Sequence, residues 1–135
     1  MTTIEEHKNI LKEFEDDINE KINRKIITKR QKIIGFTASE ASTNLFAILL
    51  HKKELIVPGF NVNHKFFASV RRASEKFPYD FPSKEKIIEL LVKQEDFRDK
   101  ICYGRSKSPE LVKGAIKNYF MLKTIVEKEF GENNE

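Results

Sequence analysis

The first third of the chain carries apolar side chains at the spacing of an α-helix, and this pattern limits the fold more than any other feature. Residues three, four or seven positions apart share one helical face. The apolar residues of this set are Ile4, Leu11, Phe14, Ile18, Ile22 and Ile26. No glycine or proline occurs in residues 3–34, so this span predicts either one long helix or two helices with a break near Thr28. No segment alternates apolar and polar residues for long enough to predict a sheet, which indicates an all-α fold.

A second helix is predicted from about residue 28 to residue 53. Gly35-Phe36 is a weak stop signal, so we expect this helix to run straight through it. Several residues of its apolar face are small and would let a neighbouring helix approach closely. The residues expected to face inward are Ile34, Ala38, Ala41, Leu45, Ile48 and Leu49.

Three further helices are predicted in the second half of the chain. Proline and glycine in residues 57–61 predict a loop, and a third helix is expected from about 62 to 76, with Phe66, Phe67 and Val70 buried. The fourth helix is expected to start at a Ser83 cap. The fifth has a serine cap, then proline, and a glycine after its last turn, at Ser108, Pro109 and Gly131.

The 135 residues are expected to form one domain, residues 1–135, folded as an up-and-down bundle of four to five antiparallel helices. Charged residues make up 34% of the chain, which favours a soluble protein. No apolar stretch approaches the ~20 residues of a membrane span and no signal peptide is recognisable, so we expect a cytoplasmic protein with no membrane partner. Cys102 is the single cysteine, which excludes an internal disulfide.

Positive charge is unevenly distributed. Residues 21–32 contain six basic residues and no acidic one, while the preceding residues 5–20 are rich in acids, and the formal net charge of the chain is +4. Such a segment can bind a phosphate backbone or an acidic partner, or it can be a solvated helical face. The sequence leaves these alternatives open.

Most familiar catalytic and metal-binding patterns are missing. The five glycines are scattered, so no glycine-rich phosphate loop is present. The three histidines, His7, His51 and His64, fall on different predicted elements without metal-ligand spacing. Repeated Glu/His sets of the di-iron bundles are also absent. We therefore expect neither a metal nor a cofactor.

The end of the predicted fourth helix is the best candidate for a site. Arg98 lies in its last turns, and a guanidinium suits phosphate oxygens. Tyr103, Arg105 and Lys107 come next, just before the amino end of the fifth helix, where backbone N–H groups favour anions. The alternative is a structural role, in which Arg98 pairs with a neighbouring carboxylate (Glu95 or Asp99) and Tyr103 packs with its hydroxyl at the surface.

At these residues the chain resembles the HEPN domain family (the higher-eukaryote and prokaryote nucleotide-binding domain). It is most similar to small prokaryotic single-domain members encoded beside minimal nucleotidyltransferases. The resemblance covers residues 33–130: a helix ending "FAILLHKKELI", a loop, a histidine that opens the next helix in "NVNHKFFASVRRASEKF", a helix ending "DFRDKICYG" and a long last helix. His64 falls where that branch often has a histidine, and Cys102 stands where it commonly has aspartate.

The resemblance implies a helical bundle that forms a homodimer, with the ends of the fourth helices meeting near the two-fold axis. Many members are metal-independent ribonucleases that use an arginine and a histidine four to six residues later. Here Arg98 matches the arginine, but Tyr103 stands in the histidine's place, and its ordinary pKa of ~10 makes it a poor base. Some members are silenced when a nucleotidyltransferase adds nucleotides to a tyrosine near this motif, which makes Tyr103 a candidate acceptor.

Three functions are expected from these features. The first is a HEPN-like module without strong catalysis that binds a nucleotide, RNA or a nucleotidyltransferase partner. Its anion-facing rim would be Arg98, Tyr103, Arg105 and Lys107, with His64, Arg71 and Arg72 as contributors from the third helix. On this reading, replacing Arg98 by alanine weakens binding without unfolding the protein. The alternatives are a ribonuclease toxin of a toxin-antitoxin pair that uses Arg98 and Tyr103, or a structural adaptor whose basic segment docks an acidic partner.

Overall fold

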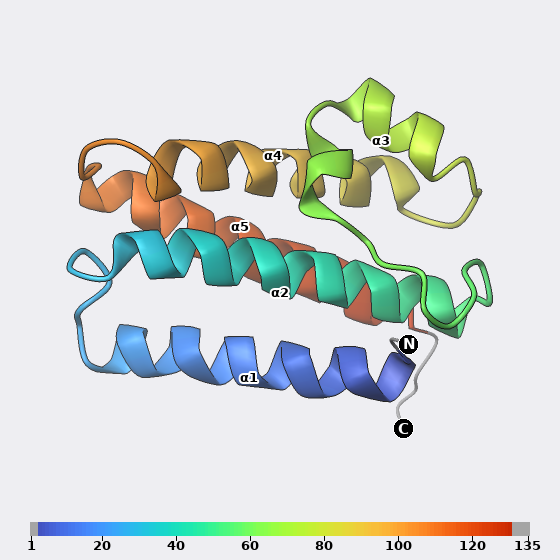
Figure 1. Cartoon of the computed structure of the whole chain (residues 1–135), viewed down its shortest axis with the longest axis horizontal. Helices are drawn as coiled ribbons and strands as arrows, with labels where there is room; N and C mark the ends of the chain where they lie inside the picture. The colour runs from blue at the N-terminus through green and yellow to red at the C-terminus, as the bar shows by residue number, and fades with distance from the viewer. Residues whose placement is uncertain (1–2, 131–135) are drawn as a thin grey trace.

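Four long helices form the body of the protein. The computed structural model describes residues 3–130, and these residues form helices joined by loops, with no strand among them. The long helices are α1 (Ile4–Asn23), α2 (Gln31–Lys52), α4 (Lys84–Cys102) and α5 (Pro109–Lys128). They run up and down beside one another, with the short helix α3 (Val70–Lys76) on the outer side of α4 (Figure 1). The predicted all-α bundle is confirmed.

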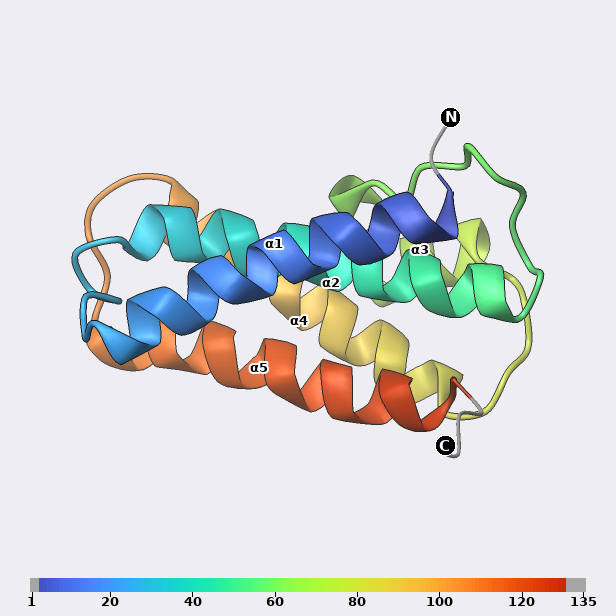
Figure 2. The same ribbon diagram turned by 90° about the horizontal axis from the view of Figure 1, so that it is seen from below.

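The first span is two helices and not one. Thr3 caps α1 through a reciprocal capping box with Glu6, and α1 ends at Asn23. The chain then reverses over residues 24–30, where Lys25 adopts a left-handed backbone with φ of 57°. The helix α2 starts at Gln31 and not at Thr28 as expected, and its cap residue Arg30 makes no side-chain capping bond. Figure 2 shows α1 lying diagonally across α2.

The central helix of the bundle is α2, which contacts α1, α4 and α5. It runs through Gly35 without a break, and the six residues predicted to face inward are all buried. It is the one described helix long and apolar enough, by length and composition, to cross a membrane. Because 83% of its apolar window is buried inside the bundle, it has the burial of a core helix in a soluble protein.

The predicted third helix is wrong in its extent. The chain instead forms a single turn of 3-10 helix, His64–Phe67, and then α3, which begins at a new cap, Ser69. The two pieces place Phe67 in the core but leave Val70 51% exposed. Phe67 stacks on Phe77, with ring centres 5.6 Å apart. Two capping residues within seven positions, Asn63 and Ser69, explain the interruption because each satisfies the N–H groups of a new helical start.

The predicted ends of the last two helices, α4 and α5, agree with the structure to different degrees. Ser83 is the N-cap residue of α4 as predicted, but it has a left-handed backbone and its side chain makes no capping bond. Its hydroxyl instead donates to a Glu129 oxygen at 3.2 Å. Ser108 caps α5 as predicted, with proline in the first turn. The stop predicted at Gly131 lies outside the described residues.

Candidate nucleic-acid interface

Two basic loops meet at one end of the bundle. The α1–α2 connection and the α4–α5 connection lie side by side there (Figures 1 and 2). Residues 21–39 contain six Lys and Arg and residues 100–109 contain three, and neither segment contains an Asp or a Glu. We call this end of the bundle the basic end. Its cations are Lys21, which is buried, and Arg24, Lys25, Lys29, Arg30, Lys32, Lys100, Arg105 and Lys107. Three of them pair with carboxylates on their own helices, namely Lys21, Arg24 and Lys100.

Specific hydrogen bonds hold the two loops together. The backbone N–H of Lys107 donates to Gln31 Oε1 at 2.6 Å, and Gln31 Nε2 donates to the carbonyl of Thr28 at 3.0 Å. Lys32 Nζ donates to the carbonyl of Gly104 at 2.8 Å. Gln31 is buried, so its bonds are shielded from water, whereas the Lys32 bond is exposed. The bonds of Gln31 and Lys32 to the second loop hold the two loops together.

The surface of the basic end is concave and carries an aromatic ring. A hollow of about 260 Å³ is lined by residues 28–33 and Ser106. Tyr103 is 61% exposed where α4 gives way to an extended backbone. Gly104 comes next with φ of 80°, a value that suits glycine because it has no Cβ. The turn leaves the Tyr103 side chain on the surface beside the cations of both loops.

The Arg98 side chain lies inside the protein and not on this surface. Arg98 is 8% exposed. Its Nη1 donates to Glu40 Oε2 at 2.8 Å and to Ser39 Oγ at 3.1 Å, both on α2. The guanidinium also lies over the Phe36 ring, 4.9 Å from its centre. The carboxylate partner is therefore Glu40, and not Glu95 or Asp99 as the structural alternative expected.

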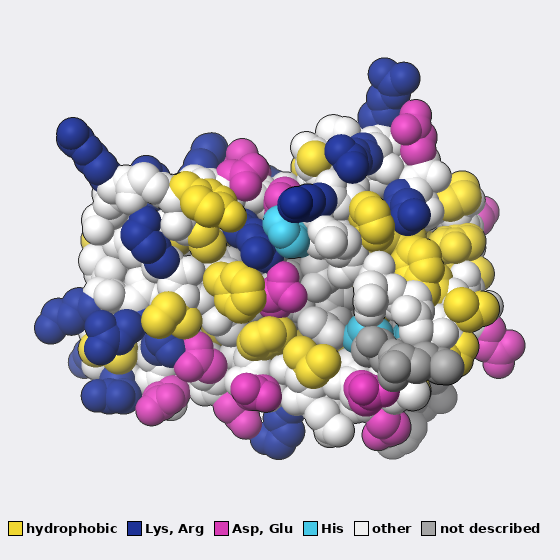
Figure 3. Space-filling view, in the orientation of Figure 1, with side chains coloured by type: hydrophobic (Ala, Val, Ile, Leu, Met, Phe, Trp, Pro, Cys, Tyr) yellow, Lys and Arg dark blue, Asp and Glu magenta, His cyan; other side chains and the backbone are white. Residues whose placement is uncertain are grey.

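His64 is held next to the helix that carries Arg98. Its Nδ1 lies 2.8 Å from Glu95 Oε1, and Glu95 is one turn before Arg98 on α4. Burial raises the pKa of the Glu95 carboxyl, and the hydrogen bond from His64 opposes that rise. The structure thus brings His64, Glu95, Arg98 and Glu40 into one polar cluster. Figure 3 shows basic, acidic and histidine side chains close together near the middle of one face of the molecule.

The two arginines of the third predicted helix lie elsewhere. Arg71 and Arg72 are exposed on α3, which packs on α4 and on the 3-10 turn, away from the basic end (Figure 1). Arg71 pairs with Glu75 on the same helix. The structure therefore separates these two residues from Tyr103, Arg105 and Lys107.

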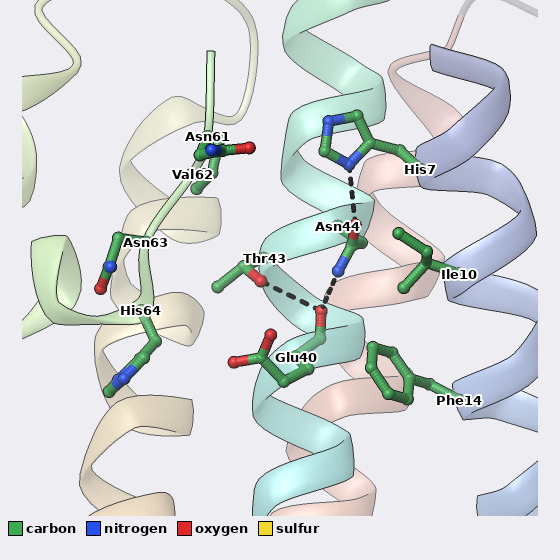
Figure 4. Close-up of a pocket in the computed structure, with 10 residues that line it drawn as sticks. All are labelled: His7, Ile10, Phe14, Glu40, Thr43, Asn44, Asn61, Val62, Asn63 and His64. Atoms are coloured by element: carbon green, nitrogen blue, oxygen red, sulfur yellow. Dashed lines mark hydrogen bonds between the residues drawn. The ribbon is translucent and has the colours of Figure 1, made fainter. Parts of the chain in front are cut away.

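A cleft opens beside the polar cluster. It has a volume of about 390 Å³ and lies between α1, α2 and the segment that precedes the 3-10 turn. Figure 4 shows Glu40 between His64 on one side and Phe14 on the other, with Asn44 further along α2 and His7 facing it from α1. No lysine or arginine lines it. The ten lining residues are His7, Ile10, Phe14, Glu40, Thr43, Asn44, Asn61, Val62, Asn63 and His64.

No group of three or more metal-binding side chains occurs in the described part of the chain. Burial raises the pKa of the Cys102 thiol, which disfavours the reactive thiolate. The polar groups of the basic end and of the cleft are thus suited to hydrogen bonding and ionic contact.

No protein-family model, no curated protein and no solved structure matches the chain. Its function is therefore inferred from the geometry and chemistry of these two surfaces.

Sequence reasoning did not find Glu40, Gln31 or the cleft. Glu40 is the first acidic residue after a run of nineteen residues without one, 21–39, and this isolation is the one signal that sets it apart. Gln31 carries no signal of its own, because its role depends on a loop 76 positions away.

Proposed function

We propose that this protein is a HEPN-like helical module that binds single-stranded RNA or nucleotides through its basic end, without strong catalysis. The observation that carries the proposal is the convergence of two acid-free basic loops, locked to each other through Gln31 and Lys32, at one end of the bundle. Lysine and arginine side chains in this arrangement attract a phosphate backbone. An exposed aromatic ring among them, Tyr103, offers a surface on which a base can stack.

The proposal refines the rim expected from the sequence. Tyr103, Arg105 and Lys107 belong to the RNA-facing surface, whereas Arg98 is buried and pairs with Glu40. Weak or absent catalysis is supported by the same separation: the arginine is buried and paired, and the tyrosine in the histidine's place is exposed at the end of the bundle. A cytoplasmic location and a minimal nucleotidyltransferase partner belong to the same proposal.

The test compares two double variants of equal charge. Lys29→Ala with Arg105→Ala removes one cation from each loop of the basic end, and Arg71→Ala with Arg72→Ala removes two cations from α3. We expect the first to weaken binding of an oligouridylate of about 12 nucleotides at least tenfold at ~50 mM salt, and the second to leave it unchanged. Fluorescence anisotropy measures both.

Equal losses in the two variants, or no binding by the unmodified protein at low salt, would contradict the proposal. The second result would favour an adaptor that docks an acidic protein through the same cations.

One observation favours the ribonuclease alternative. His64 is oriented by Glu95, as a general base held by a carboxylate would be, and Glu95 lies one turn before Arg98 on α4. In this form of the alternative, His64 supplies the proton transfer that Tyr103 performs poorly. It predicts RNA cleavage without added metal that is lost in His64→Asn and retained in Tyr103→Phe. Loss of RNA cleavage in Tyr103→Phe but not in His64→Asn would instead support Arg98 and Tyr103, the catalytic pair expected from the sequence.

A further inference from the structure

The cleft beside Glu40 is chemically unlike the basic end. Its polar walls are a carboxylate, a hydroxyl, carboxamides and two imidazoles, and none of its lining residues is a lysine or an arginine. Its volume of about 390 Å³ is within the range of small-ligand sites. A phosphate would find no lysine or arginine on its walls, so a ligand here is recognised by other groups.

Glu40 presents free hydrogen-bond acceptors to this space. Arg98 occupies one position on Oε2, whereas a carboxylate has about four acceptor positions over its two oxygens. Figure 4 shows the carboxylate turned toward the His64 side of the cleft, with the Phe14 ring on the other side of the Glu40 side chain. The Phe14 ring packs edge-on against Phe36, with ring centres 6.4 Å apart, and this contact holds the aromatic wall of the cleft in place.

His7 is held at the end of the cleft by Asn44. Asn44 donates through Nδ2 to the carbonyl of Glu40 at 2.8 Å, so its Oδ1 faces His7 Nδ1 at 2.7 Å. Because Oδ1 accepts, Nδ1 carries the proton, and Nε2 of an uncharged ring is an acceptor. His7 is 5% exposed and its Nε2 is buried without a hydrogen-bond partner in the described residues. This nitrogen lies beneath the surface, so the acceptors that the cleft presents are those of Glu40.

The Arg98–Glu40 ion pair decides whether the cleft favours a charged or a neutral hydrogen-bond donor on its ligand. Arg98 already neutralises the Glu40 carboxylate, so a second cation would be repelled by the guanidinium at close range. A neutral group with two adjacent N–H donors avoids this repulsion. Among the four RNA bases only guanine presents two adjacent donors, N1–H and N2–H, on its Watson–Crick edge; adenine and cytosine pair an amine with a ring acceptor, and uracil has one ring donor between two carbonyls.

We propose that this cleft binds a guanine base, with Glu40 accepting from N1–H and N2–H and the Phe14 ring against the base. The guanine site extends the proposed function and rests on it, because the bound RNA or nucleotide supplies the base. Gln31 at the basic end and Asn44 at the cleft are thirteen residues apart on α2, or about 20 Å along the helix. A few nucleotides of single strand cover that span, so one RNA reaches both surfaces.

The experiment uses guanosine, which lacks a phosphate and therefore reports on the cleft alone. Backbone amide resonances of the unmodified protein are followed by NMR as guanosine, inosine or adenosine is added. We expect saturable shifts at Thr43, Asn44 and His64 with guanosine. Inosine lacks the N2 amine and should bind about tenfold more weakly, and adenosine more weakly still. Because this comparison changes the ligand, it does not depend on the folding of a variant.

A matched pair of variants then assigns the acceptor. Glu40→Gln replaces one acceptor by a donor and should abolish the preference for guanosine over inosine, whereas Glu13→Gln, the same change at an exposed position of α1, should preserve it. Equal binding of guanosine and inosine, or shifts confined to the basic end, would overturn the proposal.

A guanine-free oligouridylate separates the two proposals. If it binds the basic end while guanosine does not bind the cleft, the guanine site is wrong and the proposed function stands. If guanosine binds the cleft and no RNA binds, the guanine site stands and the proposed function is wrong.

Discussion

At the scale of single residues, the role of Arg98 depends on what neutralises it. A surface arginine is available to a phosphate, but Arg98 donates to Glu40 and Ser39 and lies over Phe36. Its side chain is 10% exposed and that of Glu40 is 28% exposed. The arginine therefore joins α4 to α2, and the sequence could not show this because Glu40 is 58 positions away.

Replacing Arg98 by alanine should destabilise the protein. The change leaves the Glu40 carboxylate partly buried without its cation, and removal of one partner from a buried pair typically costs about 3–5 kcal/mol. Since Glu40 keeps some access to water, we expect about 2–3 kcal/mol, measured by urea unfolding. Arg98→Lys should lose less, and Arg72→Ala on the exposed face of α3 should have little effect. An unchanged unfolding midpoint in Arg98→Ala would refute the structural role.

The pair of histidines between α1 and α2 should make stability depend on pH. Burial and the nearby His7 lower the pKa of His51 from its ordinary value of 6.5, and the two rings are 5.4 Å apart. The unfolded chain takes up a proton at His51 before the folded protein does. The contribution of the uncharged His51 to the free energy of unfolding is therefore complete above pH 6.5. It is lost as the pH falls through the lower pKa of the folded state.

Urea unfolding at about pH 7.5 and pH 5.5 tests this sign. We expect the unmodified protein to lose more stability on acidification than His51→Asn does. Glu95, whose pKa is raised by burial, acts in the opposite direction, but it is present in both proteins and cancels in the comparison. The same loss in both would show that His51 does not contribute.

At the scale of helices, local patterns predicted the elements that have one apolar face and clear ends. The six inward positions of α2 and the Ser108-Pro109 start of α5 are of this kind. The segment 62–76 failed because its apolar residues fit one helix, while two capping residues divide it. Helix propensity and apolar periodicity do not show whether a cap within the segment outweighs continuation of one helix. The packing of Phe67 on Phe77 decides that the segment forms two pieces.

Gly35 allows α2 and α4 to approach closely. A Cβ added there would lie 3.0 Å from Ile101 Cγ2 and 3.1 Å from Cys102 Sγ. Gly35→Ala should therefore cost about 1–3 kcal/mol through overpacking. Gly114→Ala is the matched control on α5, where the nearest atom is Phe97 Cζ at 3.2 Å, on a half-buried ring that has room to move. There the gain of up to about 1 kcal/mol in helix propensity should leave stability unchanged or raised. Equal unfolding midpoints for the two variants would argue against a tight α2–α4 contact.

At the scale of the whole molecule, the basic end exists because the order of the helices brings two loops together. The sequence identified the basic segment 21–32 and the residues Tyr103, Arg105 and Lys107 separately, but it did not predict that the two loops adjoin. It also grouped Arg71 and Arg72 with them, although these residues lie on α3. An up-and-down bundle places alternate connections at the same end, so the convergence results from the fold once the number and order of long helices are known.

This convergence bears on the homodimer that the resemblance implies. If the ends of the α4 helices meet, two basic ends face each other, and the nine Lys and Arg of one basic end repel those of the other at low salt. A bound RNA strand between them removes this repulsion. We therefore expect sedimentation velocity to show monomers at low salt, more dimer as salt is added, and a complex of two chains per oligouridylate at low salt. The Lys29→Ala, Arg105→Ala variant should dimerise more readily without RNA, because it brings fewer charges to the interface. A complex of one chain per RNA, or an association that ignores salt, would place any dimer contact away from the ends of α4.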